Sequence, residues 1–151
     1  MKKRTLIIIS ILSVLIIGII GYLGYLKYHL IRHPDIQKTL KGAIMARDYK
    51  DEKTLDKAEK LFKEAIEINP DRAEAYIGLG GVYFSQKRFK EAENAFKKAI
   101  ELNPNSAGVY YAFGVCYRAQ ERYDEAARMF SKALEINPKD EYAQIFLQDV
   151  K

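Results

Sequence analysis

The residues of this chain best suited to metal chemistry are its only two histidines, His29 and His33, with Asp35 close behind them. Imidazoles four residues apart share one face of a helix, and a nearby carboxylate would add a third ligand for a divalent metal ion. Pro34, however, breaks a helix directly after His33, and no further imidazole is present to complete a site. We therefore interpret the two as interfacial histidines and predict no metal site.

Carboxylates are frequent, but they alternate with Lys and Arg along helical stretches, as at Glu64, Glu67, Asp124 and Glu125. This alternation is typical of a solvated helix face. The sequence contains no glycine-rich phosphate loop, no Ser/His/Asp set and no zinc-ligand spacing. We predict no catalytic activity, no cofactor and no small-molecule substrate. The single cysteine, Cys116, cannot form an internal disulfide, and we expect it to be a small buried core residue.

An Asn-Pro pair recurs three times at intervals of 34 residues, at 69–70, 103–104 and 137–138. The segments 73–106 and 107–140 are identical at 14 of 34 positions. Because a residue before proline is disfavoured in the helical conformation, each Asn-Pro step predicts the end of a helix. A repeat of this length indicates an array whose function lies in a surface and not in a catalytic pocket.

Within each unit the apolar residues return at spacings of three and four, as along Ala92, Phe96 and Ala99, so each unit is predicted to be a hairpin of two amphipathic helices. Turns are expected near Lys53, Lys87 and Glu121. Asp71 followed by Glu74 suggests a capping box at the start of a helix. Small residues should let the paired helices approach closely, and Phe96 and Phe130 should fill the space between successive hairpins. The small residues are Gly80, Gly114, Ala92, Ala126, Ala99 and Ala133.

The repeated residues resemble those of the tetratricopeptide repeat, in the pattern Tyr76-x2-Leu79-Gly80-x2-Tyr83, Ala92-x3-Phe96 and Pro104. The resemblance implies an all-α, right-handed superhelical array of about three helix-turn-helix repeats. Its units would be 39–72, whose first helix is degenerate because Gly42 replaces a large aromatic residue, then 73–106 and 107–140. Residues 141–151 carry apolar residues at helical spacing and are predicted to form a terminal capping helix.

The other prominent feature is the uncharged run of 22 residues at 5–26, which follows a basic tail at 1–4. A helix of this length roughly matches the 30 Å hydrocarbon core of a bilayer. Tyr22, Tyr25, Tyr28 and Lys27 form the aromatic and basic fringe expected at a headgroup layer. We therefore expect a single-pass anchor that contacts the lipid bilayer, followed by a juxtamembrane linker at 27–38. A cleaved signal peptide is the alternative, although the run exceeds the usual length and lacks the small-residue pair of a cleavage site.

The excess positive charge of the chain lies beside this run. Residues 1–38 carry a net charge of +5 and residues 39–151 a net charge of zero. The repeats therefore lack the basic surface of a nucleic-acid-binding domain, and we predict no nucleic-acid partner. The two flanks of the run hold nearly equal numbers of basic residues, which leaves its orientation open. Its short basic start favours repeats on the extracytoplasmic side.

The functional surface is expected on the concave side of the array, which is formed by the first helices of the hairpins. We predict a groove lined by Arg47, Ile77, Gly81, Phe84, Tyr111, Val115 and Arg118. Such a mostly apolar lining suits an amphipathic helix or extended peptide of a protein partner. Some similar proteins bind a chaperone's terminal carboxylate through Lys, Arg and Asn on these helices. The matching positions here hold Ala43, Gly78, Gly108 and Ala112, with Arg47 alone in keeping.

Three functions fit these features. The first is a membrane-anchored adaptor or scaffold whose groove holds a partner in a membrane-associated complex. The second is a structural component that forms a homo-oligomer through its end helix or its degenerate first unit, and the third is a holdase-like chaperone. A purely structural interpretation of the groove also stays open, in which Phe84 and Tyr111 only pack against neighbouring first helices.

Overall fold

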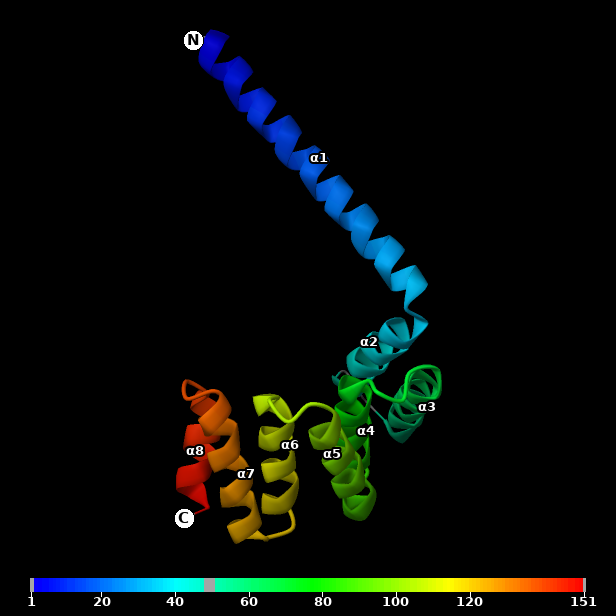
Figure 1. Ribbon diagram of the computed structural model, residues 1–151, viewed down its shortest axis with the longest axis vertical. Coiled ribbons are helices and arrows are strands. Elements are labelled where there is room, and N and C mark those ends of the chain that lie inside the picture. The colour runs from blue at the N-terminus through cyan, green and yellow to red at the C-terminus, as the bar shows by residue number, and fades with distance from the viewer. Residues whose placement is uncertain (1, 48–50, 151) are drawn as a thin grey trace.

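The computed structural model describes the backbone of residues 2–47 and 51–150, and the side chains of 15–29, 32–47 and 51–150. The described residues form helices joined by short turns, which confirms the all-α prediction (Figure 1). The helices are α1 (Lys2–Arg32), α2 (Pro34–Arg47), α3 (Glu52–Ile68), α4 (Ala73–Ser85), α5 (Phe89–Leu102), α6 (Ala107–Arg118), α7 (Tyr123–Ile136) and α8 (Glu141–Asp149).

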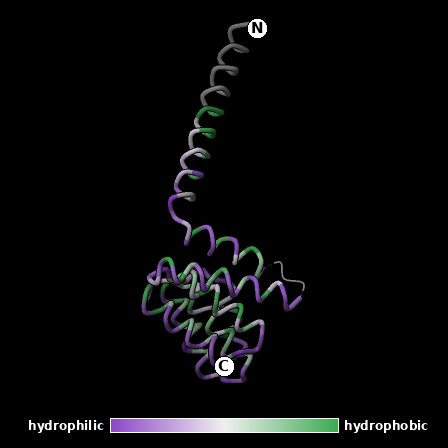
Figure 2. The backbone as a smooth tube through the Cα atoms, turned by 90° about the vertical axis from the view of Figure 1, so that its right-hand side faces the viewer, coloured by the Kyte–Doolittle hydropathy of each residue, from purple (hydrophilic) through white to green (hydrophobic). Residues whose placement is uncertain are grey.

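The repeated units are three helical hairpins, in which α2 packs on α3, α4 on α5 and α6 on α7. Each second helix contacts the first helix of the next unit, and α8 packs against α7 in the same way. Contacts between α2 and α4 and between α4 and α6 place the first helices along one side of the stack. Figure 2 shows apolar and polar residues alternating along these helices, as amphipathic packing requires.

The core of the array depends on close approach between a phenylalanine of each second helix and a small residue of its partner. Phe96 and Phe130 are fully buried. A Cβ atom built on Gly80 would lie 2.7 Å from a ring carbon of Phe96, and one on Gly114 would lie 2.6 Å from a ring carbon of Phe130. Phe96 also lies 5.5 Å from the ring of Phe113 in the next hairpin. The ring of Phe130 lies 5.7 Å from that of Phe146 in α8, the element that follows the third hairpin. These contacts confirm the predicted close approach at both glycines and the predicted role of Phe96 between hairpins.

In the first hairpin, Phe62 is the equivalent of Phe96 and Phe130, and its ring packs against Gly42. The ring of Phe62 is fully buried, and a Cβ atom built on Gly42 would lie only 3.1 Å from it. Gly78 of the next unit approaches the same ring still more closely. Gly42 is therefore part of a packed contact, and α2 is a complete helix of 14 residues.

The turns inside the second and third hairpins fall where the sequence predicted them. Lys87 and Glu121 have φ angles of 59° and 61°. The amide N–H groups of Lys87 and Arg88 donate to the carbonyl oxygens of Phe84 and Tyr83, so a left-handed residue ends α4 in a Schellman-type arrangement. A residue in this conformation reverses the chain within a few positions.

Two local predictions were wrong. A turn was predicted near Lys53, but Lys53 lies in the first turn of α3. The helix begins earlier because the side chain of Asp51 caps it by accepting a hydrogen bond from the amide of Thr54. The predicted capping box of Asp71 is absent, since α4 starts after Arg72 without a side-chain cap. Instead, the side-chain oxygen of Asn69 accepts a hydrogen bond from the amide of Asp71. The same bond recurs at the other two Asn-Pro steps, so each Asn holds its own turn.

Helix α1 extends away from the array as a single 31-residue helix (Figure 1). Its described apolar side chains, from Leu15 to Leu26, are exposed. The side chains of residues 5–14, the first part of the predicted anchor, lie outside the described residues. Over the described part of the chain, none of the helices combines the length and apolar character needed to cross a membrane. Residues 27–38, predicted to be a linker, are helical on both sides of His33.

Candidate partner-binding groove

The predicted groove residues lie mostly on α4 and α6, the adjacent first helices of the second and third hairpins. Ile77, Gly81 and Phe84 belong to α4, Tyr111 and Val115 to α6, and all five are partly exposed. Arg118 ends α6 and is also partly exposed, whereas Arg47 ends α2 and is exposed. The apolar members pack against the buried core on one side. They therefore form a half-buried strip that runs from α4 to α6.

The strip is open at Gly81. No atom would lie within 4 Å of a Cβ atom built there. Its chain neighbour Gly80 is buried against Phe96, so the two glycines lie on different faces of α4, one packed and one open. Phe84, one turn after Gly81, packs its ring against Phe89 at 6.2 Å between centroids. A shallow, uncovered position beside an anchored aromatic ring is suited to accept an apolar side chain of a partner.

The strip continues into a pocket of about 380 Å³ at the end of α6, lined by Val115, Arg118, Ala119, Glu121 and Tyr123. Tyr123 begins α7 and remains 49% exposed. Tyr123 was not predicted to line the groove, because the predicted groove was confined to the first helices of the hairpins. The signal that could have identified it is an exposed aromatic residue directly after the turn at Glu121.

The third hairpin's part of the strip is partly covered by α8. The ring of Tyr111 lies 5.8 Å from Phe146 and 6.4 Å from Tyr142. The guanidinium of Arg118 lies 4.5 Å from the centre of the Phe146 ring and forms a 3.2 Å ion pair with Asp149. Burial raises the pKa of the Tyr111 hydroxyl. Tyr111 and Arg118 therefore hold the end helix in place, which leaves Ile77, Gly81, Phe84 and Val115 as the more open part of the strip.

Arginine clamps fix the relative positions of successive hairpins. The guanidinium of Arg88 lies 4.2 Å from the centre of the Tyr83 ring and bonds Glu59 of the preceding unit at 2.9 Å. Arg122 repeats this geometry 34 residues later, at 4.4 Å from Tyr117 and 2.6 Å from Glu93. Arg88 and Arg122 are one of the 14 identical pairs in the two repeats, but the repeat pattern alone does not identify their partners.

The acidic partner of the arginine clamp is present in the first two units and absent from the third. Glu59 and Glu93 occupy equivalent positions, and the third equivalent is Ala127. The carboxylate that would accept a further arginine is thus absent from α7. The carboxyl of Glu59 loses water on burial, which raises its pKa, but hydrogen bonds and charges from Lys63 and Arg88 outweigh this, so its pKa is lowered overall. It remains ionised near neutral pH and able to hold the arginine.

The three residues first considered for metal chemistry do not form one site in the structure. The rings of His29 and His33 lie 4.5 Å apart between centroids, but Asp35 is bonded elsewhere, to Arg72 at 2.5 Å and Asn69 at 3.1 Å. Within the described residues, no group of three or more potential ligands comes close enough to bind a metal ion. Cys116 is fully buried, as expected, and its burial raises the pKa of the thiol to about 11.

Comparison with known proteins places this geometry in a family. Residues 39–105 and residues 83–149 each match a family model described as tetratricopeptide repeat. No curated protein matches the chain. A thermophilic TPR protein from Thermus thermophilus is 25% identical with a TM-score of 0.69, over 82% of this chain and 68% of that chain. MamA is 25% identical with a TM-score of 0.64, over 82% of this chain and 71% of that chain.

A further similar structure contains a bound peptide. The first TPR domain of Spaghetti (RPAP3), solved with an HSP90 peptide, is 23% identical with a TM-score of 0.65. The match covers 76% of this chain and 90% of that chain. At this identity the likeness concerns the fold alone.

Proposed function

Since this chain belongs to the tetratricopeptide repeat family through residues 39–149, we propose that the protein is a membrane-anchored adaptor that binds a peptide or helix of a partner protein. The binding site is the half-buried strip on α4 and α6. The observation that carries this proposal is the open position at Gly81, which lies between partly exposed Ile77 and Phe84 on the first-helix side of the array. Apolar side chains in such a position gain free energy when a partner removes them from water.

The chemistry of the strip favours an apolar ligand over an acidic one. Spaghetti's first TPR domain binds an HSP90 peptide, so an array of the same fold can hold a peptide. In this chain, two of the positions that would clamp a carboxylate are Gly108 and Ala112. Arg118 is already paired with Asp149. We therefore propose an amphipathic helix or hydrophobic peptide as the ligand, with Val115 and Phe84 as its main contacts.

Anchoring by α1 is the second part of the proposal. The uncharged run at 5–26 lies within one continuous helix, and its described apolar side chains from Leu15 to Leu26 remain exposed. A bilayer would cover this surface. Confinement raises the effective concentration of the groove toward membrane-associated partners, so a modest affinity suffices. We place the array on the extracytoplasmic side, which protease protection of sealed vesicles would test.

Variants at Gly81 test the groove. Gly81→Arg fills the open position with a large charged side chain, while arginine is the better helix former, so the array should remain folded. The matched control is Asn94→Arg, which adds the same side chain at an exposed position of α5. Proteins captured from native membranes in mild detergent should be retained by Asn94→Arg and lost by Gly81→Arg. Equal capture by both variants would reject the groove.

Variants in α1 test the anchor separately. Leu15→Arg combined with Ile19→Arg places two charges in the apolar run, where each costs about 2.5–3.5 kcal/mol at the centre of a membrane helix. The protein should then leave the membrane fraction on alkaline extraction. Retention of the double variant, or recovery of a mature protein that begins after Leu26, would contradict the proposed anchor.

Self-assembly is a second candidate function, favoured by the outer face of α8. Tyr142 and Ile145 are 69% and 61% exposed, although α8 occupies the position of a first helix. A second copy that packed on this face would bury both side chains. Sedimentation of the purified full chain in mild detergent, at increasing protein concentration, distinguishes the two functions. A constant monomer rejects assembly, whereas oligomers that disappear in Ile145→Glu would support it.

A further inference from the structure

An apolar hollow of about 670 Å³ lies in the corner between α1 and α2. Leu23 and Leu26 line it from α1, and Leu40, Ile44 and Met45 line it from α2. We propose that this corner is a lipid-binding surface, in which one face of α2 lies in the headgroup layer of a phospholipid bilayer. The inference rests on the proposed anchor and goes beyond it, because it assigns a membrane contact to a helix of the repeat array itself.

The residues that line the hollow indicate how deep it would lie in the bilayer. Leu23 and Leu26 lie in the last turn of the uncharged run at 5–26, which places them at the edge of the hydrocarbon core if that run spans the bilayer. Leu40 and Ile44 share one hollow with them. The headgroup layer is about 5–8 Å thick on each side of the core. The side chains of α2 that face this hollow therefore lie within reach of the layer.

Helix α2 has the two faces that such a position requires. Gly42 is buried, and Ala46 is partly buried and packed against the core, on the side that faces the array. Leu40 and Ile44, four residues apart, are 52% and 49% exposed. Helix α1 ends at Arg32 and α2 begins at Pro34, and in Figure 1 α2 runs across the direction of α1. A helix that lies across a membrane-spanning helix, with apolar residues on the membrane side, has the geometry of an interfacial amphipathic helix.

The charges around the hollow match an anionic headgroup layer. Lys27 and Lys41 both line it. Within the described residues neither forms an ion pair, in contrast to Lys38, which is bonded to Glu64 on α3. A lysine that lies beside an apolar surface can extend its ammonium group to lipid phosphates while its methylene groups remain in contact with acyl chains.

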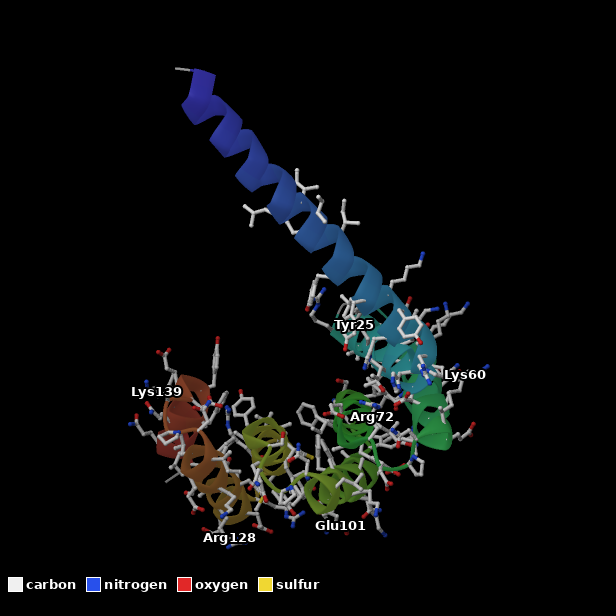
Figure 3. The ribbon with its side chains drawn as sticks, turned by 45° about the horizontal axis from the view of Figure 1, so that its top comes forward. Tyr25, Lys60, Arg72, Glu101, Arg128 and Lys139 are labelled. Atoms are coloured by element: carbon white, nitrogen blue, oxygen red, sulfur yellow. The ribbon has the colours of Figure 1, made fainter. Side chains whose placement is uncertain are left out.

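Contacts on the opposite side attach α2 rigidly to the array. Asp35 is 4% exposed and bonds Arg72, which lies between α2 and α4 (Figure 3), and also Asn69. Thr39 donates to the carbonyl oxygen of Asp35 and extends the network along the helix. Because α2 cannot rotate independently of these contacts, a bilayer that holds α2 would also set the orientation of the groove relative to the membrane.

Spin labels on the full chain test this inference. Single variants Ile44→Cys, Ile19→Cys and Lys97→Cys report on α2, on the anchor and on the exposed face of α5 as the matched control. Cys116 can stay in place, since its buried thiol should not react. Each labelled protein is reconstituted into vesicles of phosphatidylcholine and phosphatidylglycerol, and collision with oxygen and with an aqueous nickel complex is measured. Unchanged helical circular dichroism confirms that each variant is folded.

We expect the label at position 19 to be deep, the label at 97 to be aqueous, and the label at 44 to shift from the aqueous value toward the deep one. A deep label at 19 with an aqueous label at 44 would overturn the inference and leave the anchor intact. A label at 44 shielded from both oxygen and nickel would also overturn it, because another protein would then cover the corner. An aqueous label at 19 would reject the anchor together with the inference.

Discussion

The neighbouring glycines of α4 provide a matched pair of substitutions with opposite expected effects on stability. Gly80→Ala adds a methyl group 2.7 Å from a ring carbon of Phe96, whereas Gly81→Ala adds the same group where nothing lies within 4 Å. Both changes remove a glycine from the same helix, so their effects on helix propensity are equal. The difference between the two variants therefore isolates the packing against Phe96.

The expected magnitudes follow from the two opposing terms. Alanine is favoured over glycine in a helix interior by about 1 kcal/mol, so Gly81→Ala should stabilise the array by about that amount. Overpacking of a filled core costs about 1–3 kcal/mol. Phe96 is 1% exposed and in contact with Phe113, so it has little room to move away. We expect the upper part of that range to apply, and a net destabilisation of about 2 kcal/mol for Gly80→Ala.

Thermal unfolding in mild detergent, followed by circular dichroism, measures both effects. With about 4 °C per kcal/mol for a domain of this size, Gly80→Ala should lower the Tm by about 8 °C and Gly81→Ala should raise it by about 4 °C. Adding Phe96→Leu to Gly80→Ala should recover part of the loss, because the smaller side chain makes room for the methyl group. Shifts of the same sign for both glycines would refute this account of the core.

Three further predictions concern Cys116, Asp35 and the arginine clamp. The thiol of Cys116 has a pKa raised to about 11 by burial, so a thiol reagent at neutral pH should modify it only after unfolding, and full labelling of the native protein would contradict its position. Burial alone would raise the pKa of Asp35, but hydrogen bonds from Arg72 and its charge lower it overall, so its carboxylate stabilises the fold above the unfolded-state pKa. Asp35→Asn should therefore cost about 2 kcal/mol at pH 7 and progressively less as the pH falls below about 4, and a cost independent of pH would be inconsistent with this. Glu93→Gln weakens a partly exposed ion pair with Arg122, so its loss of Tm should be smaller than that of Gly80→Ala and should shrink in high salt, whereas a large, salt-independent loss would show that the clamp acts in another way.

The repeat and its packing were predictable because they depend on local spacing. The Asn-Pro steps mark helix ends, and the positions of Gly80 and Phe96 in the repeat identify a close contact within one hairpin. Asn69 marks a helix end in the sequence, whereas the hydrogen bond that its side-chain oxygen accepts from the amide of Asp71 is seen only in the structure. The predictable features involve residues that are close in the sequence or that repeat with the 34-residue period of the array.

The features that sequence reasoning missed depend on contacts between units. Asp35 is an acidic residue within a predicted linker, and only the packing of α2 on α4 brings it to Arg72, 37 residues later. Tyr111 was predicted to line an open groove, and its contact with Phe146 depends on where α8 folds back. No local pattern contains such information, because it arises from the angles at which successive hairpins stack.

The most direct test of the proposed adaptor function is site-specific photocrosslinking in native membranes. A benzoylphenylalanine residue replaces Phe84 on the strip or, as the control, Lys97 on the exposed face of α5. The proposal predicts a discrete protein adduct from position 84 that disappears when Gly81→Arg is added, and no such adduct from position 97. Absence of an adduct at position 84, or the same adducts from both positions, would contradict it.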